Sequence, residues 1–194
     1  MKNITLWIVL GLVALLGIGG CNSYNGLVSK EEAVKKSWGQ VENVYQRRMD
    51  LIPNLVNTVK GAANFEQGTL EKVIQARANA TSMKIDPSNL SPEQIQKFQS
   101  AQGELSTALG RLMAISEAYP ELKATQNFSE LQSQLEGTEN RIAVERNRFN
   151  EVVGDYNTSV RRFPANIFAG IFGFTQKGYF EADKGAEKAP EVKF

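Results

Sequence analysis

The stretch VKKSWGQVENVYQRRMDLIPNLVNTVKGA, residues 34–62, decides the fold of this chain. Its apolar side chains recur in alternating steps of three and four residues, the spacing of a helix that buries one stripe along its length. The stripe consists of Val34, Trp38, Val41, Tyr45, Arg48, Ile52, Leu55, Val59 and Ala62. The pattern predicts a long helix over 29–63 that packs on partner helices as in a coiled coil.

Three further helices follow from the same period and from the prolines and glycines between them. They are expected at 66–84, 91–118 and 128–162. The last has a stripe as long as the first, made of Phe128, Leu131, Leu135, Thr138, Ile142, Glu145, Phe149, Val152 and Tyr156. No segment alternates apolar and polar residues for long enough to predict a strand. The expected fold is all-α, an antiparallel up-down-up-down four-helix bundle with long helices.

Local signals mark one helix start and one distortion. Ser91, Pro92 and Gln94 occupy the N-cap, first-turn and capping-box positions of the third helix. Pro53 lies inside the first pattern, where it removes a backbone donor and clashes with the preceding turn. We expect a kink there, because the stripe continues in phase beyond Pro53; a break in the helix is the alternative.

Each long stripe contains one charged residue, Arg48 in the first and Glu145 in the last. In an antiparallel pair of these helices Arg48 is expected to face residues 143–144, within one turn of Glu145. We therefore predict a structural ion pair between the two that fixes the register of the helices. The alternative is that both side chains extend to the rim of the bundle and reach water.

The start of the chain is uncharged from Ile4 to Gly20, between Lys2 and the single cysteine, Cys21. This run of 17 residues is at the short limit of what spans a bilayer. Three interpretations remain open: a single-pass helix, a lipoprotein signal with lipidation at Cys21, and a cleaved secretory signal. All three place the chain at or across a membrane, and the signal-like start favours an extracytoplasmic bundle.

Composition excludes several classes of site. The chain has no histidine and one cysteine, which excludes Ser-His-Asp and Cys-His catalytic groups, His-bearing zinc sites and intramolecular disulfides. No motif for a metal or cofactor is present, so none is expected. Residues 29–163 contain 17 basic and 17 acidic side chains. A surface of mixed sign and no net charge argues against nucleic acid as a main partner.

Several short motifs together resemble the LemA family. They are Tyr24–Val28, Gln46–Val56 with Val59 and Lys60, Ala76–Ala78, Tyr119–Lys123, Glu136–Ile142, Arg148–Asn150, Tyr156–Asn157 and Phe163–Pro164. The resemblance implies a bacterial protein with an N-terminal membrane helix, a helical bundle and no established enzymatic activity. It also implies a short N-terminus outside the cell, which is opposite to the orientation that the signal-like start favours.

The end of the chain adds a second apolar segment. An up-down bundle returns the last helix to the membrane side, so residues 161–174 are expected near the bilayer. Arg161, Arg162, Phe168 and Phe172 are the candidates for membrane contact. In the alternative, the arginines complement the helix C-terminus and the phenylalanines cover the end of the core. Residues 175–194 are expected to be polar and mobile.

The expected organisation is an anchor or signal at 1–28, a bundle at 29–163, and a membrane-proximal segment with a flexible tail at 164–194. The function that fits best is a membrane-anchored, non-enzymatic scaffold that binds an unidentified protein partner. A membrane-surface module that organises lipid through 161–174 is the alternative. An enzyme is the third hypothesis, with Glu136 and Glu139 one turn apart, but acidic pairs at that spacing usually form a solvated helix face.

Overall fold

The computed structural model describes residues 2–61 and 66–182, without the side chains at positions 2–6, 9 and 12–16 of the first helix. Across these ranges the chain is all-α, and no strand occurs in them. The helices are α1 (Lys2–Lys60), α2 (Gln67–Ser82), α3 (Pro92–Ser116), α4 (Pro120–Lys123), α5 (Gln126–Arg161) and α6 (Ala165–Phe172). The four long helices of the sequence prediction are confirmed, and α4 and α6 are additions to it.

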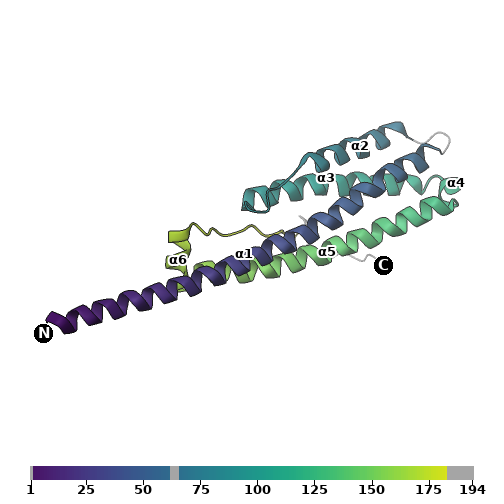
Figure 1. Ribbon diagram of the computed structural model, residues 1–194. Helices are drawn as coiled ribbons and strands as arrows, with labels where there is room; N and C mark the ends of the chain where they lie inside the picture. Colours follow the sequence, from purple (N-terminus) through teal and green to yellow (C-terminus); the bar gives the residue numbers. More distant parts are fainter. Residues whose placement is uncertain (1, 62–65, 183–194) are drawn as a thin grey trace, which may run out of the picture.

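Helix α1 is continuous from Lys2 to Lys60, so the apolar start and the first stripe belong to one element (Figure 1). No break marks the expected boundary near residue 28. Pro53 lies inside the helix, and the alternative of a helix break at this proline is therefore wrong. The predicted anchor, residues 4–20, includes positions whose side chains lie outside the described residues. In the part of the chain that the structure describes, no helix combines the length and apolar character needed to cross a membrane.

The helices form a long pair and a short pair. Helix α5 lies antiparallel to α1, while α2 and α3 form a hairpin over the half of α1 that is distant from the N-terminus (Figure 1). The all-helical character of the predicted fold is confirmed, and its regular four-helix bundle arrangement is not. Helix α1 extends well past its partners at the N-terminal end.

Two apolar clusters hold the helices together. The cluster nearer the N-terminal end centres on Trp38 of α1, Phe98 of α3 and Phe149 of α5. The distant cluster joins residues such as Ile52 of α1 and Leu105 of α3. Most stripe residues are buried, as the period predicts; Leu131, Glu145 and Val152 are half-buried, and Ala62 lies outside the described residues.

The ends of two helices follow known capping rules. Ser91 accepts a hydrogen bond from the backbone N–H of Gln94 at 3.4 Å, which confirms the predicted N-cap of α3. Helix α6 ends at Gly173, whose φ of 78° lies in the left-handed region that favours glycine. The chain then leaves α6 as an extended segment.

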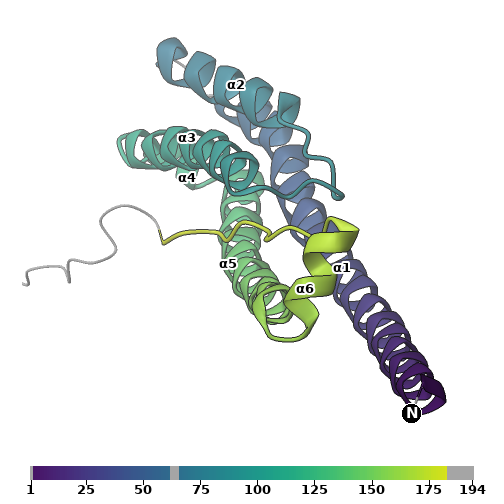
Figure 2. The same cartoon turned by 90° about the vertical axis from the view of Figure 1, so that its left-hand side faces the viewer.

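Residues 174–182, here called the C-terminal segment, run back along the bundle from α6 toward the middle of α5 and the first turns of α3 (Figure 2). Lys177, Gly178 and Phe180 are buried in it. The prediction of a polar, mobile tail is therefore wrong for residues 175–182. Side chains of the helices bind this extended segment without any partner strand, an arrangement that the sequence pattern does not indicate. The remainder of the expected tail, 183–194, lies outside the described residues.

Candidate functional site

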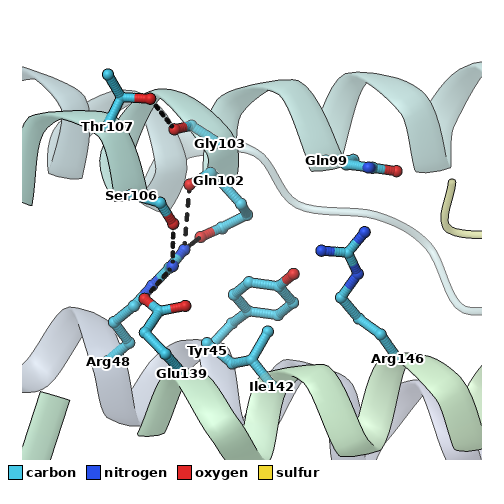
Figure 3. A pocket seen from close by; sticks show the side chains of 10 residues that line it. All are labelled: Tyr45, Arg48, Gln99, Gln102, Gly103, Ser106, Thr107, Glu139, Ile142 and Arg146. Atoms are coloured by element: carbon cyan, nitrogen blue, oxygen red, sulfur yellow. Dashed lines mark hydrogen bonds and ion pairs between the residues drawn. The ribbon is translucent and has the colours of Figure 1, made fainter. Parts of the chain in front are cut away.

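A cleft of about 370 Å³ opens between α1, α3 and α5. Arg48 and Arg146 lie at its two ends with the ring of Tyr45 between them, and Gln99, Gln102 and other α3 residues form the opposite wall (Figure 3). Arg48 comes from the stripe of α1, where an apolar residue is expected. A charged group buried at a stripe position destabilises the fold unless it is paired and hydrogen-bonded inside the bundle.

The guanidinium of Arg48 is hydrogen-bonded to residues of both α3 and α5. Its side chain is 1% exposed, and Nη1 lies 2.7 Å from both Ser106 Oγ and Glu139 Oε1. Nη2 donates to the backbone and side-chain oxygens of Gln102, and the guanidinium lies over the ring of Tyr45 at 5.1 Å. Arg48 thereby joins α1 to both α3 and α5 across the cleft.

The predicted partner of Arg48 was wrong. Arg48 pairs with Glu139, whereas Glu145 lies 3.9 Å from Arg148 on its own helix. The residue numbers in the pairs Arg48–Glu139 and Trp38–Phe149 both sum to 187, not to the expected 191–192. The difference agrees with the helix ends, because α1 stops at Lys60 and not at residue 63, and α5 begins at Gln126 and not at residue 128, which displaces α5 by about one turn relative to the expected register.

Two donors beside this ion pair are buried without a partner, Arg48 Nε and Gln102 Nε2. Such groups cost free energy unless water or another acceptor reaches them. Within the described residues, no group of three or more acidic or cysteine side chains is placed to hold a metal ion. The arrangement is a network of one ion pair and several hydrogen bonds that joins α1, α3 and α5.

The C-terminal segment is held by amide side chains. Asn157 donates to the carbonyl of Lys177 and accepts from its N–H, at 2.9 and 2.8 Å. Asn150 makes the same pair of bonds with Phe180, at 2.8 and 2.9 Å. Gln99 of α3 makes it with Glu181, at 2.9 and 3.1 Å. Three carboxamides thus replace the neighbouring strand that an extended backbone normally pairs with.

The side chains of the segment enter specific surroundings. Phe180 stacks on Trp38 with ring centroids 6.1 Å apart and meets the rings of Phe98 and Phe149 edge-on. Lys177, which is 6% exposed, pairs with Glu31 at 2.8 Å. The segment therefore completes the apolar cluster around Trp38.

No side chain fits at Gly178. A Cβ placed there would lie 2.7 Å from the Cα of Pro92, a distance that real Cβ atoms do not show. The N–H of Gly178 also donates to the carbonyl of Leu90 at 2.9 Å. The segment passes so close to the start of α3 that glycine is required at this position.

Tyr156 lies where α5 meets the same segment. Its hydroxyl donates to the carbonyl of Thr175 at 3.0 Å. Burial and, as the smaller cause, the negative charge of Glu31 together raise the pKa of Tyr156 to about 12. The phenol is therefore neutral and able to donate throughout the physiological range.

The model of the LemA family matches residues 37–194, which is most of the chain. The chain belongs to the LemA family. The match includes both halves of the site, the Arg48 cleft and the C-terminal segment, and it confirms the resemblance found in the sequence motifs.

Relatives of this LemA family member share moderate identity over most of its length. Magnetosome protein MamQ of Magnetospirillum gryphiswaldense is 29% identical over 186 residues, covering 87% of this chain and 68% of the relative. Magnetosome protein MamQ 2 of Paramagnetospirillum magneticum is 28% identical with the same coverage. Protein LemA of Metamycoplasma hominis is 21% identical over 160 residues, covering 82% of this chain and 69% of that protein.

The remaining predicted residues of this LemA family member lie at the N-terminal end of the bundle. Cys21 is a free, exposed thiol on α1. Arg161 and Arg162 are exposed at the end of α5. Phe172 is half exposed and meets Tyr24 edge-on at 4.9 Å. Phe168 points at α1, because a Cβ at Gly20 would lie 2.9 Å from its ring.

Glu136 and Glu139, the pair considered for catalysis, have separate partners. Glu136 accepts from Gln132 on its own helix at 3.0 Å, whereas Glu139 bonds Arg48. The amides that hold the C-terminal segment were not assigned this role from sequence. The available signal was the spacing of Asn150 and Asn157, seven residues apart on one face of α5.

Proposed function

We propose that this protein is a membrane-held, non-enzymatic scaffold whose helical body binds another protein. One observation carries the proposal: exposed apolar side chains occur on the N-terminal part of α1 and on α6, and α6 lies against α1 next to the part that extends past the other helices (Figure 1). On α1 they include Trp7, which is 72% exposed, and on α6 they include Ile171, which is 69% exposed. Apolar surface gathered in this way is typical of a contact with lipid or protein.

Helix α6 is positioned where the uncharged part of α1 ends. Phe168 contacts the helix at Gly20, and Phe172 and Phe174 meet Tyr24. A run of 17 residues extends about 25 Å as a helix, close to the thickness of a bilayer core. With residues 4–20 in the membrane, α6 would lie at its surface. The body is proposed to lie outside the cytoplasm, because a signal-like start precedes Cys21.

Family membership supports attachment through the N-terminal residues, because the LemA resemblance implies an N-terminal membrane helix, although the orientation that it implies is the opposite one. The second candidate function, organisation of lipid by residues 161–174, is favoured by the outward-facing side chains of α6. Phe163, Ile167 and Ile171 are exposed there, next to the exposed Arg161 and Arg162. Short amphipathic helices with neighbouring arginines bind the interface of anionic membranes.

Vesicle flotation tests both placements with the purified full chain. The double variant Ile8→Lys with Leu10→Lys should leave the vesicle fraction, since each lysine in a bilayer core costs about 2.5–3.5 kcal/mol. The matched control carries lysine at two exposed body positions, Gln75 and Asn79, and should float like the wild type. A wild-type chain that stays in the soluble fraction would rule out membrane attachment.

The variant Ile171→Ser with Phe172→Ser separates the two functions. If the protein is a scaffold held only by its first residues, the variant should float like the wild type, and neither protein should change the order of the vesicle lipids. For a lipid-organising module, the full chain should lose its effect on the order of anionic vesicles, measured by a fluorescent membrane probe, while still floating.

A further inference from the structure

The C-terminal segment is bound as a peptide is bound. It has no strand partner of its own, and the amides of Asn157, Asn150 and Gln99 pair with both backbone groups of Lys177, Phe180 and Glu181. Recognition through backbone groups in an extended chain is the principle of β-strand addition. Here side chains of the helices supply the hydrogen-bonding groups that the edge of a β-sheet supplies in that mode.

At three positions of the segment, the surroundings favour one kind of side chain. At 177 the groove accepts a basic side chain, because Nζ of Lys177 meets Glu31 at 2.8 Å and the carbonyl of Ser88 at 3.1 Å. At 178 only glycine fits against Pro92. At 180 an aromatic ring fills the space beside Trp38 and Phe149. The groove thus selects the pattern Lys-Gly-x-Phe in an extended chain.

The groove itself is built by α1, α3, α5 and the connection before α3, without help from the segment. Trp38, Phe98 and Phe149 come from these three helices, as do Glu31 and the three amides. The segment has no helical hydrogen bonds of its own, and such segments open locally more readily than the helices they cover. When the segment detaches, the aromatic side chains around Trp38 become exposed to water until another segment packs on them.

We propose that this groove is a peptide-binding site. Its ligand is an extended segment of a partner protein with a basic residue, glycine and an aromatic residue at relative positions one, two and four. The chain's own residues 174–182 occupy the site and must be displaced by the partner. This inference rests on the proposed scaffold function and names the chemistry of its protein partner.

The test uses the full chain with Phe180→Ala, which weakens its own segment, and a fluorescent peptide copying residues 174–182. The control peptide has alanine in place of the glycine that corresponds to Gly178. Fluorescence anisotropy should show that the variant binds the copied peptide at least about tenfold more tightly than the control peptide, the ratio produced by a loss of about 1.4 kcal/mol. The wild-type chain should bind the copied peptide more weakly than the variant does.

Equal binding of the two peptides, or no binding by a variant with wild-type helicity, would overturn the proposal. If the variant does not fold, the wild-type chain decides the question by hydrogen exchange. Saturating copied peptide should then increase deuterium uptake of residues 174–182, and unchanged uptake would reject the proposal. Vesicle flotation is independent of these readouts, so failure of peptide binding and failure of membrane attachment are distinguishable.

Discussion

The carboxamide of Asn150 on α5 bonds both the N–H and the carbonyl of Phe180, at 2.9 and 2.8 Å. An amide side chain carries both the N–H donor and the oxygen acceptor that this pair of hydrogen bonds requires. The ring of Phe180 is simultaneously stacked on Trp38. Asn150 thus binds the backbone of the same residue whose aromatic side chain completes the apolar core.

The first prediction concerns this amide. Asn150→Asp keeps the acceptor but replaces the donor with a negatively charged oxygen that faces the carbonyl of Phe180. We expect a loss of roughly 1–3 kcal/mol in the free energy of unfolding, because a buried pairing is lost. Asn147→Asp, on an exposed position of the same helix, is the matched control and should change stability by less than about 0.5 kcal/mol. Urea unfolding followed by circular dichroism measures both; equal stabilities would contradict the pairing.

The second prediction concerns Gly178. A methyl group there overlaps Pro92 at 2.7 Å, so Gly178→Ala should lower the free energy of unfolding by about 1–3 kcal/mol. Gly137→Ala is the control, since nothing lies within 4 Å of a Cβ at that position of α5. It should stabilise the helix by about 0.5–1 kcal/mol. Thermal melts of the two variants should therefore move in opposite directions, and shifts of the same sign would count against the close approach.

The third prediction separates the observed ion pair from the one expected from sequence. Glu139→Gln should destabilise by roughly 1–3 kcal/mol, because the guanidinium of Arg48 stays buried without its counter-charge. The carboxylate of Glu139 itself is 43% exposed, so water covers it when Arg48→Met removes the partner.

A double-mutant cycle checks this assignment. Arg48→Met combined with Glu139→Gln should lose at least about 1 kcal/mol less than the sum of the single losses. Arg48→Met combined with Glu145→Gln should be additive within about 0.5 kcal/mol. Coupling to position 145 in place of 139 would show that the register described here is wrong.

The fourth prediction is a pH dependence. The pKa of Tyr156 is about 12 in the folded chain, whereas an unfolded tyrosine ionises near its ordinary value of 10. Between these values the folded state holds a proton that the unfolded state has lost, so stability falls as the pH rises through this window. The loss is at most about 3 kcal/mol, since one pKa unit corresponds to 1.36 kcal/mol.

Tyr156→Phe isolates this contribution. At neutral pH the variant should lose about 0.5–1.5 kcal/mol with the hydrogen bond to Thr175. From pH 10 to 12 its stability should fall less steeply than that of the wild type. Parallel curves for the two proteins would show that Tyr156 does not titrate differently in the folded state.

Helix positions were predictable from sequence because each stripe repeats over many turns. The stripe containing Trp38 and Ile52 can only be buried by partner helices along its whole length, and the N-cap at Ser91 has an unambiguous local signature. The partner of Arg48 was not predictable to within one turn. Its position depends on where α1 ends, and helix ends vary by a few residues for reasons of tertiary packing.

The site around the C-terminal segment was harder to foresee. Residues 174–182 have neither helical nor strand periodicity, and their order comes from Asn157, Asn150 and Gln99, which are distant in sequence. Asparagine in a helix is usually read as a cap or a surface residue. Only the three-dimensional placement of Gly178 against Pro92 shows how closely the C-terminal segment approaches the start of α3.

Membrane attachment through the first residues is the central claim, and fractionation of native host cells tests it most directly. After an alkaline wash, the full chain should remain in the membrane pellet, and the intact mass of the extracted protein should distinguish an unprocessed chain from one that begins at an acylated Cys21. Either mass in the pellet agrees with the account. Recovery of the protein in the wash, with neither residues 4–20 nor an acyl group holding it, would contradict the account.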